Sequence, residues 1–359
     1  MKGLKRFFCL TAAAVAACGA LVGCGNAPTK TVYVTSYVSA QTTFSGGTAA
    51  EVVAMVAESV VEIRTESVTT QWGMQYVVSG AGSGVIVAHD ADYETYYIVT
   101  NNHVIEGARD IKVSLRSGGD AYTATLIASD VAGDIAVISI TEKSTLNVAV
   151  WGNSAELLVG EDVIAIGNPL GSLGGTVTKG IISATERSIP VGNYTMTLLQ
   201  TDTAINPGNS GGGLFNMRGE LVGVVNAKTT DEEVEGICFA IPADRARSIF
   251  DDLLTDGVVS GRVSLGVSVA VYDSSAVYVT AAAGEFKQYD RIAKINDVAV
   301  TSLLTYHDAL AALKPDDEVS VIVYHGRVAQ SFFGNVLVFD DNPTTLKVTA
   351  KQLKKGESV

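Results

Sequence analysis

Basic residues are in short supply in this sequence. Its 359 residues include 25 Lys and Arg against 38 Asp and Glu, a formal net charge of −13. Three of the cations, Lys2, Lys5 and Arg6, lie at the N-terminus, so a chain without that segment would stand at 22 − 38 = −16. A surface with this excess of negative charge repels phosphate backbones. We therefore expect no nucleic acid among the partners of this protein.

Cysteine and histidine are scarce as well. The chain has four cysteines, and only Cys238 lies beyond the first 24 residues. One thiol cannot form a disulfide within the folded body. Cys238 falls in an apolar run, and we interpret it as a small core thiol rather than a nucleophile. No His, Cys and Asp residues cluster at the spacing of metal ligands, so the sequence predicts neither a metal nor another cofactor.

The first 23 residues have the pattern of an export signal. A short basic head is followed by an apolar run from Phe7 to about Val22. The run ends in Leu21-Val22-Gly23-Cys24, which resembles the lipobox of bacterial lipoproteins, where the chain is cut before the cysteine and the thiol of Cys24 is lipidated. The alternative is an uncleaved membrane anchor. Both interpretations predict an extracytoplasmic body that is tethered to the bacterial cell membrane.

The rest of the chain divides into four parts. Residues 24–50 comprise the lipidated cysteine and a stretch rich in Thr and Ser, and we interpret them as a stalk linker. For the alternating piece Val32-Tyr33-Val34-Thr35 the alternative is a strand or an assembly contact. Short apolar or alternating runs broken by turn signals over 51–257 predict a mainly β barrel or sandwich, with helix only after Pro242. Residues 262–339 form a smaller α+β module. Residues 340–359 are expected to be a charged, solvated tail, or a segment that rests on an anionic membrane.

The stretch NPGNSGGGLFN, residues 206–216, places a serine among glycines. Such a serine is either a turn residue or a nucleophile, and a nucleophilic hydroxyl needs a histidine base oriented by a carboxylate. His103 follows a strand at a turn, where its imidazole would lie at the edge of a cleft. Asp134 opens an apolar strand that would bury its carboxylate. The other histidines are expected in solvent: His89 in a hairpin turn, and His307 and His325 in the C-terminal module.

Six motifs carry a family resemblance: TNNHV, GDIAV, AIGNPLG, TVTKGIISATER, QTDTAINPGNSGG and GICFAIP, in this order. Over about residues 80–245 the chain resembles the HtrA (high-temperature-requirement) family of trypsin-like serine proteases. The resemblance implies two six-stranded β-barrels with the active site between them. It also implies that His103 is the general base, Asp134 its orienting carboxylate and Ser210 the nucleophile. Asp130 competes for the carboxylate role, but it lies outside the GDIAV match.

The glycines around the serine suit an oxyanion hole, because backbone N–H groups must reach the developing negative charge without side chains in the way. The N–H groups of Gly208 and Ser210, with Asn209 between them, are expected to form it. Digestive relatives that cleave after Arg or Lys carry an aspartate six residues before the nucleophile, where this chain has Ala204. We therefore expect cleavage after small or aliphatic residues. The other expected pocket residues are Asn226, Ala227 and Lys228.

The C-terminal module resembles a PDZ domain. Such domains bind a peptide as an added strand and hold its terminal carboxylate on loop N–H groups. The resemblance places this loop at Ser264, Leu265, Gly266 and Val267. The sequence predicts strands near 265–267, 277–279 and 292–300, a helix over 302–313 and a hairpin that turns at His325-Gly326. The segment AAAGEFKQ is contracted relative to the family, so a docking domain without a ligand is the alternative.

Taken together, these features predict a membrane-tethered, extracytoplasmic serine endopeptidase. The resemblance implies that it degrades unfolded or damaged proteins, that its PDZ-like domain binds peptide C-termini, and that it forms a homotrimer. A non-catalytic sensor or chaperone-like peptide-binding protein on the same fold is the alternative. The presence of all three triad residues favours the enzyme.

Overall fold

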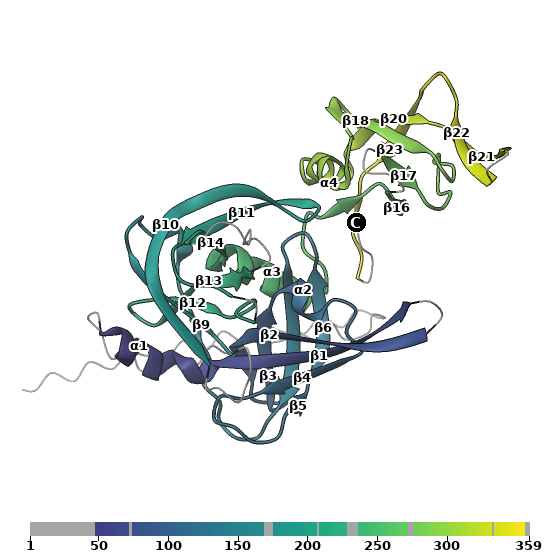
Figure 1. Ribbon diagram of the computed structural model, residues 1–359. Helices are drawn as coiled ribbons and strands as arrows, with labels where there is room; N and C mark the ends of the chain where they lie inside the picture. Colours follow the sequence, from purple (N-terminus) through teal and green to yellow (C-terminus); the bar gives the residue numbers. More distant parts are fainter. Residues whose placement is uncertain are drawn as a thin grey trace, which may run out of the picture. The chain divides into compact units, whose positions relative to one another are not determined.

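Figure 1 shows the computed structural model of the chain. The structure describes residues 47–71, 74–168, 175–206, 208–227, 236–271, 276–331 and 334–355. All of them belong to the second of two units, Val32–Val359, into which contacts divide the chain. The expected signal peptide, most of the stalk, the lipidation site Cys24 and the pocket residue Lys228 lie outside the described residues. None of the helices in the described ranges is long and apolar enough to cross a membrane.

The first β-domain is a seven-stranded antiparallel sheet with the order β5-β4-β1-β2-β3-β7-β6. Its strands are β1 (Val60–Gln71), β2 (Met74–Asp90), β3 (Thr95–Thr100), β4 (Asp110–Ser114), β5 (Tyr122–Thr123), β6 (Thr125–Asp130) and β7 (Ile135–Thr141). Side chains alternate between the two faces of a strand, so every second residue of a strand shares a face. Ile86, Ile98 and Ile138, from three neighbouring strands, are completely buried in one core cluster.

The second β-domain is a seven-stranded sheet with the order β12-β9-β10-β11-β14-β13-β8. Its strands are β8 (Val150–Trp151), β9 (Asp162–Gly167), β10 (Thr176–Val191), β11 (Tyr194–Thr201), β12 (Gly213–Asn216), β13 (Glu220–Asn226) and β14 (Cys238–Pro242). A ladder between β12 and β13 closes six strands into a ring. Register shifts near Ala184 bend the long strand β10, which curves around the barrel in Figure 1.

The mainly β architecture expected from the sequence is confirmed. Each sheet has seven strands rather than the six that the resemblance implies. The additional strand in each case is a two-residue edge strand, β5 or β8. Over the described residues no ladder closes the first sheet in the way that β12 and β13 close the second.

Helices before Pro242 are a correction to the sequence prediction. Helix α1 (Ala49–Val56) begins at a capping box in which Thr48 and Glu51 bind each other's backbone N–H groups, and it buries Val52 and Val56. Helix α2 (Asn102–Ile105) is a single turn that carries His103. Neither helix is long enough to show a clear 3.6-residue period in the sequence. The helix expected after Pro242 is confirmed as α3 (Ala243–Thr255). Two 3₁₀ turns are η1 (Ala57–Ser59) and η2 (Ser154–Glu156).

The C-terminal domain is built on a six-stranded sheet in which β16-β17-β18-β20-β23 are adjacent and β19 pairs with β18. Helix α4 (Leu303–Ala311) contributes the fully buried Tyr306 to its core. Two small sheets, β15-β24 and β21-β22, complete the domain. The strands are β15 (Val263–Ser264), β16 (Val269–Ala270), β17 (Val277–Val279), β18 (Arg291–Ile295), β19 (Val298–Ala299), β20 (Glu318–Tyr324), β21 (Gly326–Ser331), β22 (Gly334–Phe339), β23 (Thr344–Thr349) and β24 (Lys351–Gln352).

Two predictions for this domain are wrong. The hairpin expected to turn at His325-Gly326 does not form, because β20 pairs with β18 and β23 while β21 pairs with β22. The part of the expected tail that the structure describes, 340–355, is not a solvated tail, because β23 and β24 lie within it and extend the domain beyond residue 339. Leu346, Ala350 and Leu353 are buried. The lysines between these apolar positions give the segment its misleading polar composition.

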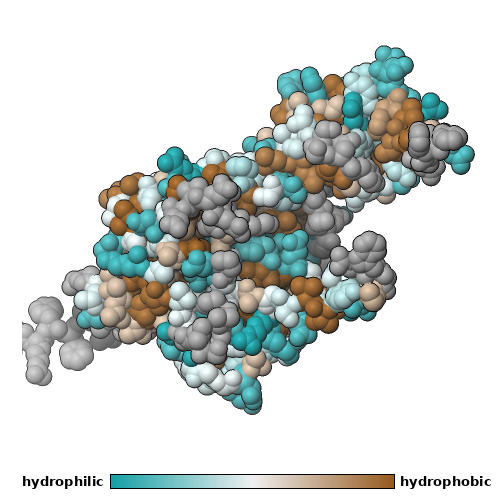
Figure 2. Space-filling model, in the orientation of Figure 1, coloured by the Kyte–Doolittle hydropathy of each residue, from teal (hydrophilic) through white to brown (hydrophobic). Residues whose placement is uncertain are grey.

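The distal part of the β1–β2 hairpin exposes much of its surface to solvent. Residues 74–81 of β2 are all exposed, and Met74, Val77 and Val78 are among the large hydrophobic side chains in contact with solvent. Strand β1 pairs with β4 up to Glu66, and among the described residues the hairpin beyond that point forms no ladder with another strand. Figure 2 shows hydrophobic residues mixed with hydrophilic ones over the visible surface.

Candidate active site

His103 and Asp134 meet in the first β-domain. His103 lies on α2, directly after β3, and Asp134 lies in the turn that leads into β7. The His103 Nδ1 atom is 2.7 Å from Asp134 Oδ2, and the backbone N–H of His103 donates to Asp134 Oδ1 at 2.9 Å. Since a carboxylate accepts only, Nδ1 must carry the proton. The neutral imidazole then has its lone pair on Nε2, as a general base requires.

Two asparagines that the sequence did not single out for this role support Asp134. The carboxylate is buried at 4% exposure and accepts a hydrogen bond from Asn226 Nδ2 at 2.9 Å. The backbone carbonyl of Asp134 accepts from Asn101 Nδ2 at 3.0 Å. Asp134 itself has φ +51°, in the left-handed region that a non-glycine residue adopts only where its surroundings hold it. No local sequence signal indicates Asn226, because it lies 92 residues from Asp134.

Ser210 lies on a loop whose glycines are sterically required. A Cβ on Gly211, which has φ +81°, would collide with the carbonyl oxygen of Ser83 and with Thr100 Oγ1. The loop is bound to the first β-domain, because Ser83 N–H donates to the Ser210 carbonyl at 2.8 Å and Ser83 Oγ donates to the Gly208 carbonyl at 2.7 Å. The loop therefore packs against the segment just before His103.

The hydroxyl of Ser210 accepts a hydrogen bond from the backbone N–H of Ala227 at 3.3 Å. Within the described ranges no hydrogen bond joins this hydroxyl to His103. In unliganded active sites such bonds are often long or absent and form only with substrate. The fold thus brings the imidazole and carboxylate into contact and packs the serine loop beside them, with the serine hydroxyl held by Ala227.

The backbone around Ser210 provides two unengaged donors. The N–H of Asn209 donates to the Asn206 carbonyl at 3.0 Å, and the Asn209 side chain is buried. By contrast, the N–H groups of Gly208 and Ser210 have no acceptor among the described residues. Gly208 has φ +100°, which suits glycine. Two free N–H groups separated by one residue are the arrangement that an oxyanion hole needs.

The structure describes three of the four expected pocket residues, and their surroundings differ. Ala204 is exposed, and its carbonyl accepts from Thr178 Oγ1 at 3.0 Å. The amide of Asn226 is directed to Asp134, and Asn226 itself lies in the ladder between β13 and β14, opposite Phe239. Ala227 is half-buried beside an apolar cluster that includes Ile205 and Cys238.

Cys238 is a buried free thiol. Burial raises its pKa, which opposes thiolate formation at neutral pH and agrees with a core role. Across the described part of the chain no three His, Cys, Asp or Glu side chains gather closely enough to hold a metal ion.

The remaining histidines are not the solvated side chains expected from the sequence. His89 is partly buried and stacks on Tyr96, with ring centroids 4.1 Å apart. His307 is buried at 7% exposure. His325 Nδ1 lies 2.7 Å from Asp290 Oδ1. His307 and His325 have partners 114 and 35 residues away, Asn193 and Asp290, which the local sequence cannot indicate, whereas His89 packs on a residue of its own hairpin.

In the loop of the C-terminal domain that is expected to bind a peptide carboxylate, one backbone N–H group already has a hydrogen-bond acceptor within the loop. The N–H of Gly266 donates to Ser264 Oγ at 3.1 Å, and Ser264 lies in β15, paired with Lys351. Leu265 is buried, and Val267 packs against the domain core. A peptide carboxylate at this loop would have to compete with the Ser264 hydroxyl for the Gly266 N–H.

Comparisons with known proteins agree with this architecture. Residues 82–224 match a trypsin-like peptidase domain, and residues 263–336 match a PDZ domain. The chain is 45% identical to the serine protease Do-like HtrA of Bacillus subtilis over 196 residues, which cover 53% of this chain and 43% of the relative. It therefore spans less than half the length of that relative.

A second relative, the serine protease Do-like HtrA of Lactococcus lactis subsp. cremoris, is 38% identical over 282 residues, covering 69% of this chain and 68% of the relative. Among solved structures, the HtrA-type protease AlgW with a tripeptide superimposes with a TM-score of 0.54 at 29% identity, over 86% of this chain and 99% of that one. The chain therefore belongs to the HtrA-type, Do-like family of trypsin-like serine proteases with a C-terminal PDZ domain.

Proposed function

We propose that this protein is a serine endopeptidase that cleaves unfolded or damaged proteins through an acyl-enzyme. The observation that carries the proposal is the contact between His103 and Asp134, which fixes the imidazole with its lone pair on Nε2. A serine loop lies beside this pair, and two of its N–H groups have no acceptor within the described ranges. Family membership supports the same reaction.

In the proposed mechanism, the Ser210 hydroxyl leaves Ala227 and gives its proton to His103 Nε2 while Oγ attacks the peptide carbonyl. The N–H groups of Gly208 and Ser210 stabilise the oxyanion of the tetrahedral intermediate. His103 then returns the proton to the departing amine, and the carbon–nitrogen bond breaks. A water molecule then attacks the ester carbonyl while His103 Nε2 accepts its proton. His103 returns this proton to Ser210 Oγ as the ester carbon–oxygen bond breaks, which releases the acid and restores Ser210.

Specificity for small or aliphatic residues on the N-terminal side of the cleaved bond is the second part of the proposal. Ala204 provides no negative charge at the position where a carboxylate would select Arg or Lys, and the neighbouring cluster is apolar. Peptide substrates with Ala, Val, Lys or Arg at this position test it. We expect the highest kcat/KM with Ala or Val. A preference for Lys or Arg would contradict the expectation.

A fluorophosphonate probe applied to the full chain tests the activity, because it reacts only with an activated serine. We expect wild type to be labelled at Ser210 and to digest casein, and the Ser210→Ala variant to do neither. An unlabelled but well-folded wild type would refute the enzyme.

One observation favours a second candidate function, a non-catalytic peptide-binding protein on the same fold. The Ser210 hydroxyl is bound by the Ala227 N–H rather than by His103. In this case the probe would leave wild type unlabelled, while unfolded polypeptide would bind wild type and Ser210→Ala equally. The PDZ-like domain would then be the expected contact for peptide C-termini.

We further propose that the protein is exported and lipidated at Cys24, because the first 23 residues have the pattern of a lipoprotein signal peptide. Growth of an expressing bacterium with a labelled fatty acid tests this. Label on wild type and its loss in Cys24→Ser would support lipidation, and label on both or neither would contradict it. Mass measurement of the purified protein tests the homotrimer that the resemblance implies.

A further inference from the structure

Asp130, the sequence competitor for the catalytic carboxylate, has a different partner. The guanidinium of Arg262 donates to it twice, from Nε to Oδ1 at 3.2 Å and from Nη2 to Oδ2 at 2.7 Å. The Asp130 and Arg262 side chains are only 9% and 20% exposed. Arg262 directly precedes β15, the first strand of the PDZ-like domain. A two-bond pair with this little solvent holds its geometry more firmly than a surface ion pair.

The same carboxylate also holds the turn that presents Asp134. Asp130 Oδ2 accepts from the N–H of Gly133 at 2.8 Å, and the N–H of Asp134 donates to the Val131 carbonyl at 3.2 Å. A Cβ on Gly133 would clash with Asp130 Oδ2 and with the tip of Ile249 on α3. The turn is therefore closely packed, and it delivers Asp134 in a left-handed conformation that needs external support.

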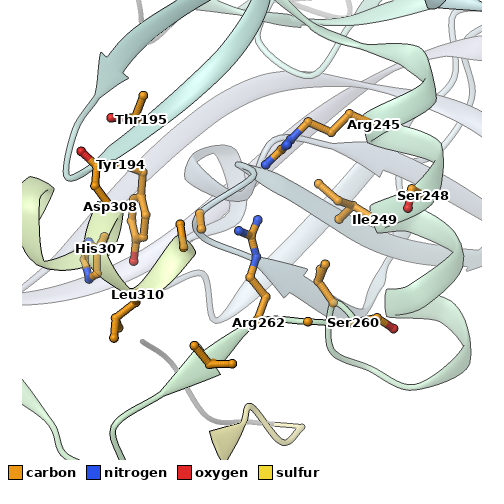
Figure 3. A pocket seen from close by; sticks show the side chains of 15 residues that line it. Tyr194, Thr195, Arg245, Ser248, Ile249, Ser260, Arg262, His307, Asp308 and Leu310 are labelled. Atoms are coloured by element: carbon orange, nitrogen blue, oxygen red, sulfur yellow. The ribbon is translucent and has the colours of Figure 1, made fainter. Parts of the chain in front are cut away.

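A second arginine, Arg245, lies near Arg262 but does not bind Asp130, so it can distinguish the effect of positive charge from the effect of the hydrogen bonds. Figure 3 shows the guanidinium groups of Arg262 and Arg245 pointing toward one another at the edge of a cavity of about 510 Å³. The Arg245 side chain is exposed, yet partial desolvation by the surrounding protein, and then the positive charge of Arg262, lower its pKa, while the charge of Asp130 opposes the shift. Arg245 makes no ion pair in the described residues and no hydrogen bond to the turn. Its removal therefore takes away a nearby positive charge and leaves the Asp130 contacts in place.

We propose that Arg262 is a positioning residue for the His103–Asp134 pair. By binding Asp130 with two hydrogen bonds it fixes the turn from Asp130 to Asp134. The entry to the PDZ-like domain is thereby connected to the proposed catalytic carboxylate through one side-chain contact. The inference rests on the proposed function, since orienting Asp134 matters for catalysis only if His103 acts as a base.

The first test compares Arg262→Gln with Arg245→Gln in the full chain, because both remove one guanidinium from the same cavity. We expect Arg262→Gln to lower kcat about 10-fold with KM changed less than about twofold, since the effect falls on the chemical step. Arg245→Gln should stay within about twofold of wild type in both constants. Arg262→Lys should be intermediate, because an ammonium cannot reproduce the two-pronged contact.

The second test does not depend on activity. The Nδ1 proton that a histidine shares with a carboxylate gives a downfield proton resonance in NMR spectra, and His103→Ala identifies the signal of His103. We expect this signal to move upfield or broaden in Arg262→Gln and to persist in Arg245→Gln. The signal of His325, which binds Asp290 at the same 2.7 Å, should remain in every variant and shows that the PDZ-like domain is folded. Circular dichroism and the melting temperature check the folding of the β-domains.

Asp130→Asn removes the ion pair with Arg262 by changing the carboxylate instead of the guanidinium. This variant replaces Arg262→Gln in both tests if Arg262→Gln does not fold. The double variant should lose no more activity than either single variant, because both changes remove one interaction. An unchanged His103 signal in both single variants, or no such signal in wild type, would overturn the inference. An inactive wild type whose His103 signal responds to Arg262→Gln would refute the peptidase and keep the positioning role.

Discussion

The described part of the chain contains two histidine–aspartate pairs, one in a β-domain and one in the PDZ-like domain, and they are nearly alike. His103 and Asp134 approach to 2.7 Å with side-chain exposures of 20% and 5%, and His325 and Asp290 approach to 2.7 Å with 19% and 0%. Distance and burial do not distinguish them. A buried carboxylate under an imidazole is therefore not by itself a sign of catalysis.

The surroundings of the two pairs differ. The Asp134 carboxylate accepts a further bond from Asn226, and the serine loop packs beside its pair. The Asp290 carboxylate accepts instead from the backbone N–H of Lys287 at 2.9 Å, and its histidine lies between β20 and β21. The second pair ties two loops of the PDZ-like domain together. The catalytic role proposed for the first pair depends on the serine loop that packs beside it.

The largest expected effect comes from removing each histidine. His103→Ala should lower kcat roughly 10⁴- to 10⁶-fold, because the serine loses its base. His325→Ala should leave kcat within about twofold and lower the melting temperature instead. Peptide hydrolysis and thermal unfolding of both variants check this. A large loss of kcat in His325→Ala would mean that the second pair is not merely structural.

Replacing each aspartate by asparagine should give a smaller but still large contrast. In Asp134→Asn the amide would donate to Nδ1 and so place the imidazole proton on Nε2, which lowers kcat by roughly 10⁴-fold. Asp290→Asn should cost about 1–3 kcal/mol of folding free energy with little effect on kcat. Equal losses of kcat in the two variants would remove the distinction between the pairs.

Asn226 tests the support that only the first pair has. Asn226→Ala removes a hydrogen bond to a buried carboxylate, worth about 1.5–3 kcal/mol, so kcat should fall about 10- to 100-fold. Asn216→Ala is the matched control, since Asn216 is a buried asparagine of the same β-domain that binds Glu220. It should lower stability and leave kcat unchanged. Wild-type kcat in Asn226→Ala would show that the amide does not support Asp134.

The smallest effect concerns His307, which contacts a carbonyl instead of a carboxylate. Its Nδ1 lies 2.8 Å from the Asn193 carbonyl oxygen, and its ring stacks on Tyr194. Burial lowers the pKa of His307, although the Asn193 carbonyl and the nearby Asp308 oppose the shift. Below about pH 6.5 the unfolded chain binds a proton at this histidine more readily than the folded state does. The free energy of unfolding therefore decreases as the pH is lowered.

Thermal unfolding at pH 7.5 and at pH 5.5 measures this contribution. His307→Gln removes the titrating group, so its melting temperature should change less between the two pH values than that of wild type. An equal change in both proteins would assign the pH dependence to other groups.

Much of the fold could be predicted from the sequence, because the signals are local. Alternating apolar residues mark the strands of both β-domains, and α3 has a helical period over enough residues to be recognised. The motifs around His103, Asp134 and Ser210 are also contiguous in the chain. The short helix α1 and the strand β23 were missed because their local composition is ambiguous and tertiary packing decides their conformation.

The sequence by itself determined the mainly β character of the chain and the three residue types needed for acyl transfer, since periodicity and short motifs need no knowledge of distant partners. Only the tertiary structure assigned Asp130 to Arg262, Asn226 to Asp134 and His325 to Asp290. These partners lie 132, 92 and 35 residues apart, and each is selected by hydrogen bonding in a buried setting that exists only after the chain has folded.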